Sequence, residues 1–267
     1  MRFDKQDEMR VVAYIQAVTQ VVLNIATSGS QSPQDTDMCL KLIAATMSVL
    51  AEYLPDGTQR IKRAAADATR LVMTHGLGKM RAADLESLSR TMSGDANGGP
   101  ERVYMNVKYL LSSRFTGDGD RSATTPADLV FYIMRAFVTN IKSEVLLDSG
   151  KLEELLQMIV QLKVERGHYK QWTSCIGAFM ARMGGQRFFQ LLPLSLIEFD
   201  LNSLSYAQDS RSWLIQLVPQ YLKKDNTLLF FVQYFLPMIL QLDKMRELEQ
   251  QVSGSPIKIK KFETLLA

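Results

Sequence analysis

The amino-acid sequence predicts an all-α fold made of antiparallel helix pairs that stack on one another. Apolar residues recur at three- and four-residue steps through most of the chain, which is the spacing of one face of an α-helix. Short polar loops separate these segments, and two helices of similar length joined by a short loop must lie antiparallel. No segment alternates polar and apolar residues over four or more positions before a hairpin turn, so we expect no strand.

The N-terminal part of the chain is expected to hold amphipathic helices that end at Gly, Pro and Ser residues. Their predicted bounds are residue 11 to the loop at 28–33, residue 35 or 36 to 54, 58–75, and 82–92. The buried faces predicted for the second and third of these helices are Leu40, Ile43, Met47, Leu50 and Leu54, and Ile61, Ala65, Ala68 and Val72.

Further helices are expected after the Gly-rich piece 94–100. Their predicted bounds are 101–115, 126–142, 152–162, 172–183, 211–223, 226–246 and 256 to the end. Gly184 and Gly185 are expected to stop the helix that precedes them, and a polar insertion covers residues 200–210. The aromatic residues at helical spacing after residue 229 are expected to lie in the core: Phe230, Phe231, Tyr234 and Phe235.

A recurrent Leu-Pro pair suggests that these helices form a repeat. It occurs at Leu54-Pro55, Leu192-Pro193 and Leu236-Pro237, with separations of 138 and 44 residues. The shorter separation, and a third of the longer one, suit the spacing of HEAT or armadillo units. We therefore expect one α-solenoid region over residues 1–267, with N-terminal helix pairs in 1–93 and the remaining repeats in 99–267.

Composition and charge limit the classes of protein that this chain can be. It has 267 residues, is 46% hydrophobic and carries a net charge of only +3, so any contact with nucleic acid must be local. Acidic residues near the N-terminus argue against a signal peptide, and the apolar run 228–240 is too short to span a membrane. Cys39 and Cys175 lie in apolar runs, which favours a reducing intracellular compartment.

Residues for catalysis are scarce. His75, His168 and the two cysteines are far apart in the sequence, so neither a zinc site nor a Cys-His nucleophile pair is expected. The neighbouring carboxylates Glu153 and Glu154 are expected to lie on a solvated helix face. We predict no catalytic residue, no metal site and no cofactor, and an enzyme of a helical class stays the less favoured alternative.

Basic clusters are the better candidates for function. Each places two or three cations within one helical turn, where they can contact phosphates or an acidic partner, or simply be solvated. The candidate residues for binding RNA or a protein partner are Arg60, Lys62, Arg63, Lys223, Lys224, Lys258, Lys260 and Lys261.

Two blocks near the C-terminus carry a resemblance to a known family. The first runs from Ile176 to Gly184 and is followed by Leu192-Pro193-Leu194. The second contains Arg211-Ser212-Trp213-Leu214-Ile215, then Leu229-Phe230-Phe231 and Tyr234-Phe235-Leu236-Pro237. Together these blocks resemble the HEAT-repeat family of ribosomal RNA-processing protein twelve, most closely over residues 170–267.

The resemblance implies a non-catalytic scaffold of ribosome biogenesis in the nucleus and nucleolus. Such a protein would bind pre-ribosomal RNA and ribosome-assembly proteins in the small-subunit processome or pre-40S particle, with no membrane and no small-molecule substrate. It implies structural roles for Arg211, Trp213, Tyr234, Phe235 and Pro237, with Trp213 as a core wedge and Arg211 as a capping or interhelical hydrogen-bond donor. Because that family is much longer, we expect the chain to be a fragment. The alternative is a HEAT-type adaptor in nuclear transport or vesicle coating.

Overall fold

A computed structural model describes the architecture of the chain. It describes residues 5–28, 33–80, 99–112, 127–141, 149–162, 164, 166–194, 199–200, 205–206, 211–222 and 228–252. The predicted helices at 82–92 and from 256 to the end lie outside these ranges. The chain forms two compact units, Met1–Phe179 and Met180–Ala267, and each is described by itself.

The first unit is helical, as the apolar periodicity predicts. Its longer helices are α1 (Lys5–Thr27), α2 (Pro33–Asp56), α3 (Gln59–Leu71), α5 (Gly99–Ser112), α6 (Ala127–Asn140) and α8 (Lys151–Val160). The short 3-10 turn η3 (Arg166–His168) then leads into α9 (Tyr169–Met183), which crosses the division between the units.

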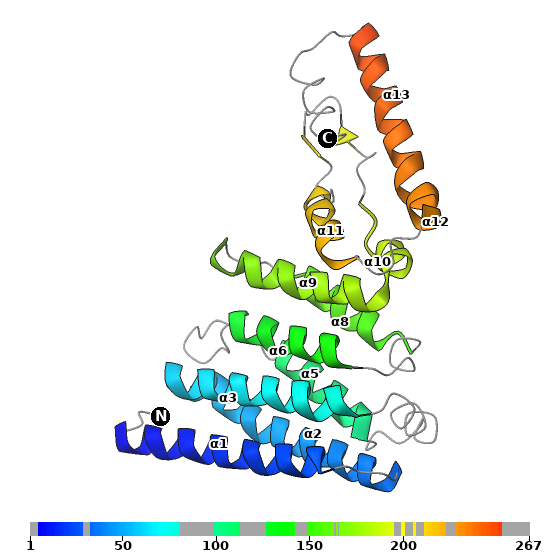
Figure 1. Ribbon diagram of the computed structural model, residues 1–267. Coiled ribbons are helices and arrows are strands. Elements are labelled where there is room, and N and C mark those ends of the chain that lie inside the picture. The colour runs from blue at the N-terminus through cyan, green and yellow to red at the C-terminus, as the bar shows by residue number, and fades with distance from the viewer. Residues whose placement is uncertain are drawn as a thin grey trace. The chain divides into compact units, whose positions relative to one another are not determined.

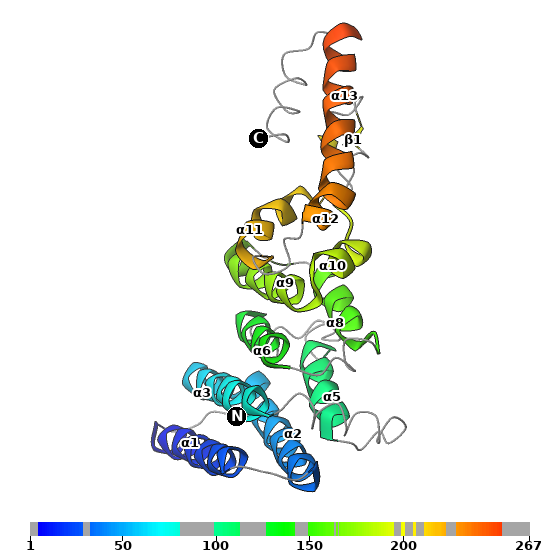
Figure 2. The same ribbon diagram turned by 45° about the vertical axis from the view of Figure 1, so that its right-hand side comes forward.

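The helices of the first unit form two layers. α1, α3 and α6 stack in one layer, and α2, α5 and α8 stack in the other, as the two views agree (Figure 1, Figure 2). Within the layers α1 contacts α3, α3 contacts α6, α2 contacts α5 and α5 contacts α8, and the pairs α1–α2, α2–α3 and α5–α6 join the layers. This two-layer arrangement is an all-α, HEAT-like solenoid, which confirms the predicted fold class.

The predicted apolar faces form the core between these layers. The five residues predicted for α2, from Leu40 to Leu54, are each at most 1% exposed. On α3 the inward residues Ile61, Ala65 and Ala68 are also buried. Side chains as small as alanine let neighbouring helices approach closely, so α3 contacts α1, α2 and α6.

The predicted helix 58–75 has nearly the expected extent, but its winding changes after Leu71. A π-helical turn, η1 (Val72–Gly76), and a 3-10 turn, η2 (Leu77–Lys79), complete the segment. The changed winding keeps Val72, Met73 and Leu77 fully buried. A Cβ at Gly76 would lie 2.9 Å from Ile43 Cδ1, so glycine lets this turn pack against α2 without a shift of that methyl group.

The second unit is less regular than the sequence predicts. Its elements are α10 (Gly185–Leu191), β1 (Phe199–Asp200), β2 (Ser205–Tyr206), η4 (Ser212–Leu217), α11 (Val218–Tyr221), α12 (Leu228–Phe230), η5 (Phe231–Phe235) and α13 (Leu236–Val252). η4 is a 3-10 helix, so a continuous α-helix over 211–223 is wrong. α10 was not predicted, because Gly184-Gly185 was interpreted only as a stop.

The prediction that no strand is present is also wrong. β1 and β2 form an antiparallel pair within the polar insertion, with Phe199 opposite Tyr206 and Asp200 opposite Ser205. Two residues per strand are too few for an alternating pattern to stand out in the sequence. The pair leaves the fold all-α in class.

The three Leu-Pro pairs do not mark equivalent positions. Pro55 lies at the end of α2, Pro193 follows α10, and Pro237 is the second residue of α13. The π-helical turn η5 directly precedes α13, and the Leu236 N–H bonds to the Phe231 carbonyl five residues back. This wider turn lies where the proline ring would crowd a regular helix.

Two helices are long and apolar enough, by length and composition, to cross a membrane. The segments are Asp7–Thr27 in α1 and Asp35–Pro55 in α2, each with a mean hydropathy of 1.3. Neither was considered as a membrane span in the sequence analysis. The core helix of a soluble protein passes the same test, and α2 packs against α1, α3 and α5.

Candidate interaction surfaces

The basic cluster at the start of α3 is divided between two faces of the helix. Thr58 caps this helix: its Oγ1 accepts from Ile61 N at 3.4 Å and donates to Glu8 Oε1 at 2.7 Å. Arg60 and Arg63 are exposed and line one groove, whereas Lys62 is half-buried and does not line it. The predicted cluster of three therefore supplies two cations to one surface.

Arg63 also belongs to a contact between α3 and α6. Its Nε lies 3.4 Å from Asp67 Oδ2, and Tyr132 Oη donates to Asp67 Oδ1 at 3.1 Å. The guanidinium carbons of Arg63 and Arg70 each lie 5.5 Å from the centre of the Tyr132 ring. Burial, and then the hydrogen bond to Asp67, raises the pKa of Tyr132, so its hydroxyl stays a donor.

A groove opens between α1 and α3, and we call it the α1–α3 groove. It encloses about 840 Å³. Its apolar lining is Ile15, Leu23, Ala64, Ala68 and Leu71, and its polar lining is Gln16, Thr19, Gln20, Gln59, Arg60, Arg63 and Asp67. The sequence singled out the two arginines but not the glutamines, because isolated glutamines on a helix carry no recognisable pattern.

The remaining basic candidates cannot be placed on a surface. Lys223, Lys224, Lys258, Lys260 and Lys261 lie outside the residues that the structure describes. Their role in binding RNA or a protein partner therefore stays a prediction.

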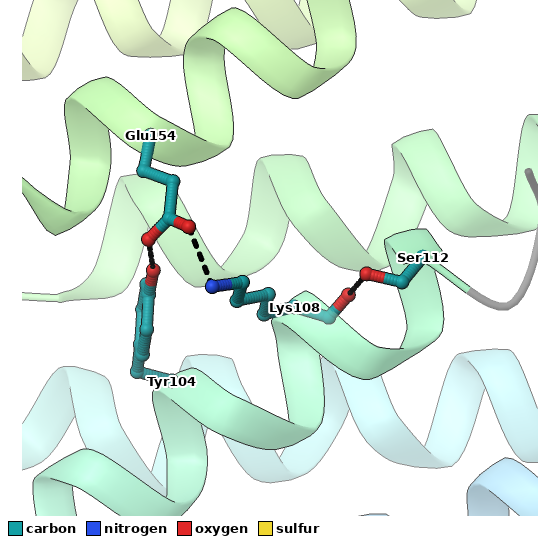
Figure 3. A network of polar contacts seen from close by, with 4 residues as sticks. All are labelled: Tyr104, Lys108, Ser112 and Glu154. Carbon is teal, nitrogen blue, oxygen red and sulfur yellow. Dashed lines mark hydrogen bonds and ion pairs between the residues drawn. The ribbon is translucent and has the colours of Figure 1, made fainter.

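A polar network that the sequence did not predict joins α5 to α8 (Figure 3). Tyr104 Oη donates to Glu154 Oε2, and Lys108 Nζ lies 2.5 Å from Glu154 Oε1. Hydrogen bonds from Lys108 and then Tyr104 lower the pKa of Glu154. Beside this network, Lys151 pairs with Glu101. Glu154 lies on an exposed helix face, as expected, but its partners on α5 were not predicted, because sequence spacing cannot reveal a partner on another helix.

Phe189 is the centre of an aromatic cluster in the second unit. It is 1% exposed, and its ring centre lies 4.9 Å from Tyr234, 5.7 Å from Phe235 and 6.2 Å from Phe230. Tyr234 Oη accepts a hydrogen bond from Leu194 N at 3.4 Å. Phe230, Tyr234 and Phe235 are half-buried in this cluster, and Pro237 is exposed. The prediction that Phe231 lies in the core is wrong, because this residue is 46% exposed.

Arg211 and Trp213 lie at the start of η4. Arg211 donates from its backbone N to Leu194 O at 3.0 Å and from Nη1 to Pro193 O at 3.1 Å. Both acceptors lie in the loop after α10, and the side chain does not cap η4, so the role of Arg211 as a capping or interhelical hydrogen-bond donor stays a prediction. Trp213 is half-buried, whereas its neighbour Leu214 is completely buried. The role of Trp213 as a core wedge stays a prediction.

Gly184 and Gly185 are required for different reasons. Gly184 has φ 78° and ψ 158°, a backbone conformation that is essentially restricted to glycine. A Cβ at Gly185 would lie 2.7 Å from Phe230 Cε1, so glycine there makes room for the aromatic cluster. The glycines thus turn the chain from α9 into α10 and allow α10 to pack.

Groups suited to chemistry are isolated in the described ranges. His75 is exposed within η1 and His168 ends η3, while both cysteines are buried thiols. Burial raises the pKa of Cys175, which keeps this thiol protonated. Across residues 5–252, outside the gaps given above, no three His, Cys, Asp or Glu side chains come together in a way that could hold a metal ion.

The stacked helix layers define a HEAT-like helical-repeat protein. The family model described as Ribosomal RNA-processing protein 12, HEAT repeats, matches residues 120–267, which is more than half of the chain. The chain therefore belongs to this family, whose proteins are of a non-catalytic type with a role in ribosome biogenesis. The match begins further upstream than the resemblance recognised from residue 170. No curated protein and no solved structure matches the chain.

Proposed function

We propose that the chain is a non-catalytic scaffold that binds pre-ribosomal particles during maturation and export of the small ribosomal subunit. Its membership of a ribosomal RNA-processing HEAT family is the observation that carries this proposal. The partners would be pre-ribosomal RNA and ribosome-assembly proteins, encountered in the nucleolus and nucleus. The two-layer stack supports a scaffold role, because such stacks present long surfaces without needing a catalytic centre.

RNA contact in this proposal is local and comes from the basic clusters. The net charge of +3 is too small for the whole surface to follow a phosphate backbone. Lys223, Lys224, Lys258, Lys260 and Lys261 fall within the part of the chain that matches the family. We assign the RNA contact to these lysines and the protein contacts to the helical surfaces.

Salt-dependent binding of the purified chain to small-subunit precursor RNA tests the RNA contact. The parent chain should bind more weakly as salt rises, because each neutralised phosphate releases a counterion. A variant with the five lysines changed to glutamine should show a smaller slope of log K against log salt. A variant with Lys5, Lys41, Lys79, Lys170 and Lys244 changed to glutamine removes the same number of charges outside these clusters and controls for net charge. Equal slopes for the parent and the five-lysine variant would contradict the assignment.

A further inference from the structure

We infer that the α1–α3 groove is a docking site for an amphipathic helix of a partner protein that carries Asp or Glu beside its apolar face. The inference deepens the proposed scaffold function, on which it rests, by stating the kind of partner that this part of the chain binds. The groove lies entirely within the first unit and upstream of the residues that match the family model.

The shape of the groove fits a helix of about two turns. On α1, Ile15, Thr19 and Leu23 follow one another at four-residue steps and form one stripe, with Ile15 and Thr19 buried at the floor of the groove and Leu23 half-buried. At a rise of 1.5 Å per residue, this stripe is about 12 Å long. On α3, half-buried Ala64 lies on the opposite wall, and buried Ala68 closes the floor between the two helices. Apolar residues at i, i+4 and i+7 of a partner helix match such a groove.

The charges at the groove favour an acidic partner. Asp67, the acidic residue of the lining, is already bound by Arg63 and by the Tyr132 hydroxyl. Arg60 makes no ion pair with any residue that the structure describes, and it is exposed. Glu8 on α1 accepts a hydrogen bond from Thr58, two residues before Arg60. The groove therefore offers a carboxylate on the partner an exposed cation that has no ion partner among the residues that the structure describes.

The same surface is poorly suited to RNA. Two arginines, one of them shared with Asp67, neutralise few phosphates, and affinity for a nucleic-acid backbone grows with the number of neutralised phosphates. The apolar lining cannot hydrogen-bond or neutralise a phosphate, whereas burial of leucine-like side chains against it is favourable. The amides of Gln16, Gln20 and Gln59 can hydrogen-bond polar side chains at the margin of a docked helix.

Selection from a displayed library of helix-forming 14-residue peptides tests this inference on the full chain. The selected peptides should be enriched in Asp and Glu beside apolar residues at i, i+4 and i+7. Arg60→Glu should weaken their binding at least tenfold, because it replaces the exposed cation with a negative charge that repels the carboxylates of the peptide. Lys62→Glu makes the same change in charge two residues away and outside the groove, and it should alter affinity less than twofold.

Two further measurements decide between the possible outcomes. Ala64→Phe fills the groove and should abolish peptide binding, and thermal unfolding of each variant verifies that it folds. Peptides that bind the Lys62→Glu and Arg60→Glu variants equally, or that are not enriched in acidic residues, would overturn the inference. Displacement by small-subunit precursor RNA that depends on Arg60 would assign the groove to RNA instead. If the Arg60→Glu variant no longer binds the peptides but still associates with pre-ribosomal particles, the proposed function stands. If the parent chain itself does not associate with such particles, the proposed function alone is overturned.

Discussion

Phe189 is an almost completely buried ring in the aromatic cluster of the second unit. Its ring meets those of Phe188, Phe230, Tyr234 and Phe235 within 6.2 Å, and it is 1% exposed. Truncation of such a residue removes buried apolar surface and leaves a cavity. The cluster thus depends on α10, an element that the sequence did not predict.

Phe189→Ala should lower the free energy of unfolding by about 3–5 kcal/mol, measured by urea denaturation. Phe231→Ala is the matched control: this ring is 46% exposed, so its loss should cost about 1 kcal/mol or less. Similar losses for the two variants would contradict the packing described for α10.

Glu154 should make stability depend on pH. Its folded-state pKa lies below the ordinary value of 4.5, so its contribution is complete above pH 4.5 and is lost as pH falls through the lowered folded-state pKa. Glu154→Gln should flatten this acid-side loss in thermal unfolding measured from pH 7 to pH 3. Exposed Glu52, changed to Gln, should keep the acid-side slope of the parent. An unchanged slope for Glu154→Gln would contradict the network in Figure 3.

The connection between α9 and α10 depends on the backbone conformation of one residue, Gly184. Its positive φ lets the chain leave α9 and enter α10 within a single residue. Gly184→Ala should lower the free energy of unfolding by about 1–3 kcal/mol, measured by urea denaturation. Gly167→Ala is the control, because a Cβ there would meet nothing within 4 Å and φ is not positive. Equal costs at these two glycines would contradict the strained turn.

Apolar periodicity predicted the regular helices but not the departures from them. The faces of α2 and α3 were predicted correctly, because each is a long stripe at helical spacing. η1, η4 and η5 carry the same apolar composition as an α-helix, and only their hydrogen bonds reveal 3-10 or π winding. Periodicity also does not reveal α10, because Gly185–Leu191 is too short to show a repeating apolar face.

At the scale of the whole molecule, the fold class and the family could be predicted from the sequence, but the interaction surfaces only in part. Arg60 and Arg63 were predicted together with Lys62, yet the winding of α3 places only the arginines in the α1–α3 groove. The groove also needs α1, whose position beside α3 depends on packing between distant segments. Neighbouring basic residues in the sequence therefore predict a cluster of charge. Which of them share a surface depends on how the helices pack.

Purification of the tagged full chain from cells, followed by gradient sedimentation and quantification of the bound RNA, tests the scaffold proposal most directly. We predict that the chain sediments with small-subunit precursor particles and enriches precursor over mature ribosomal RNA. Sedimentation only with nuclear-transport cargo or vesicle-coat proteins, free of precursor RNA, would contradict a role as a scaffold of small-subunit maturation.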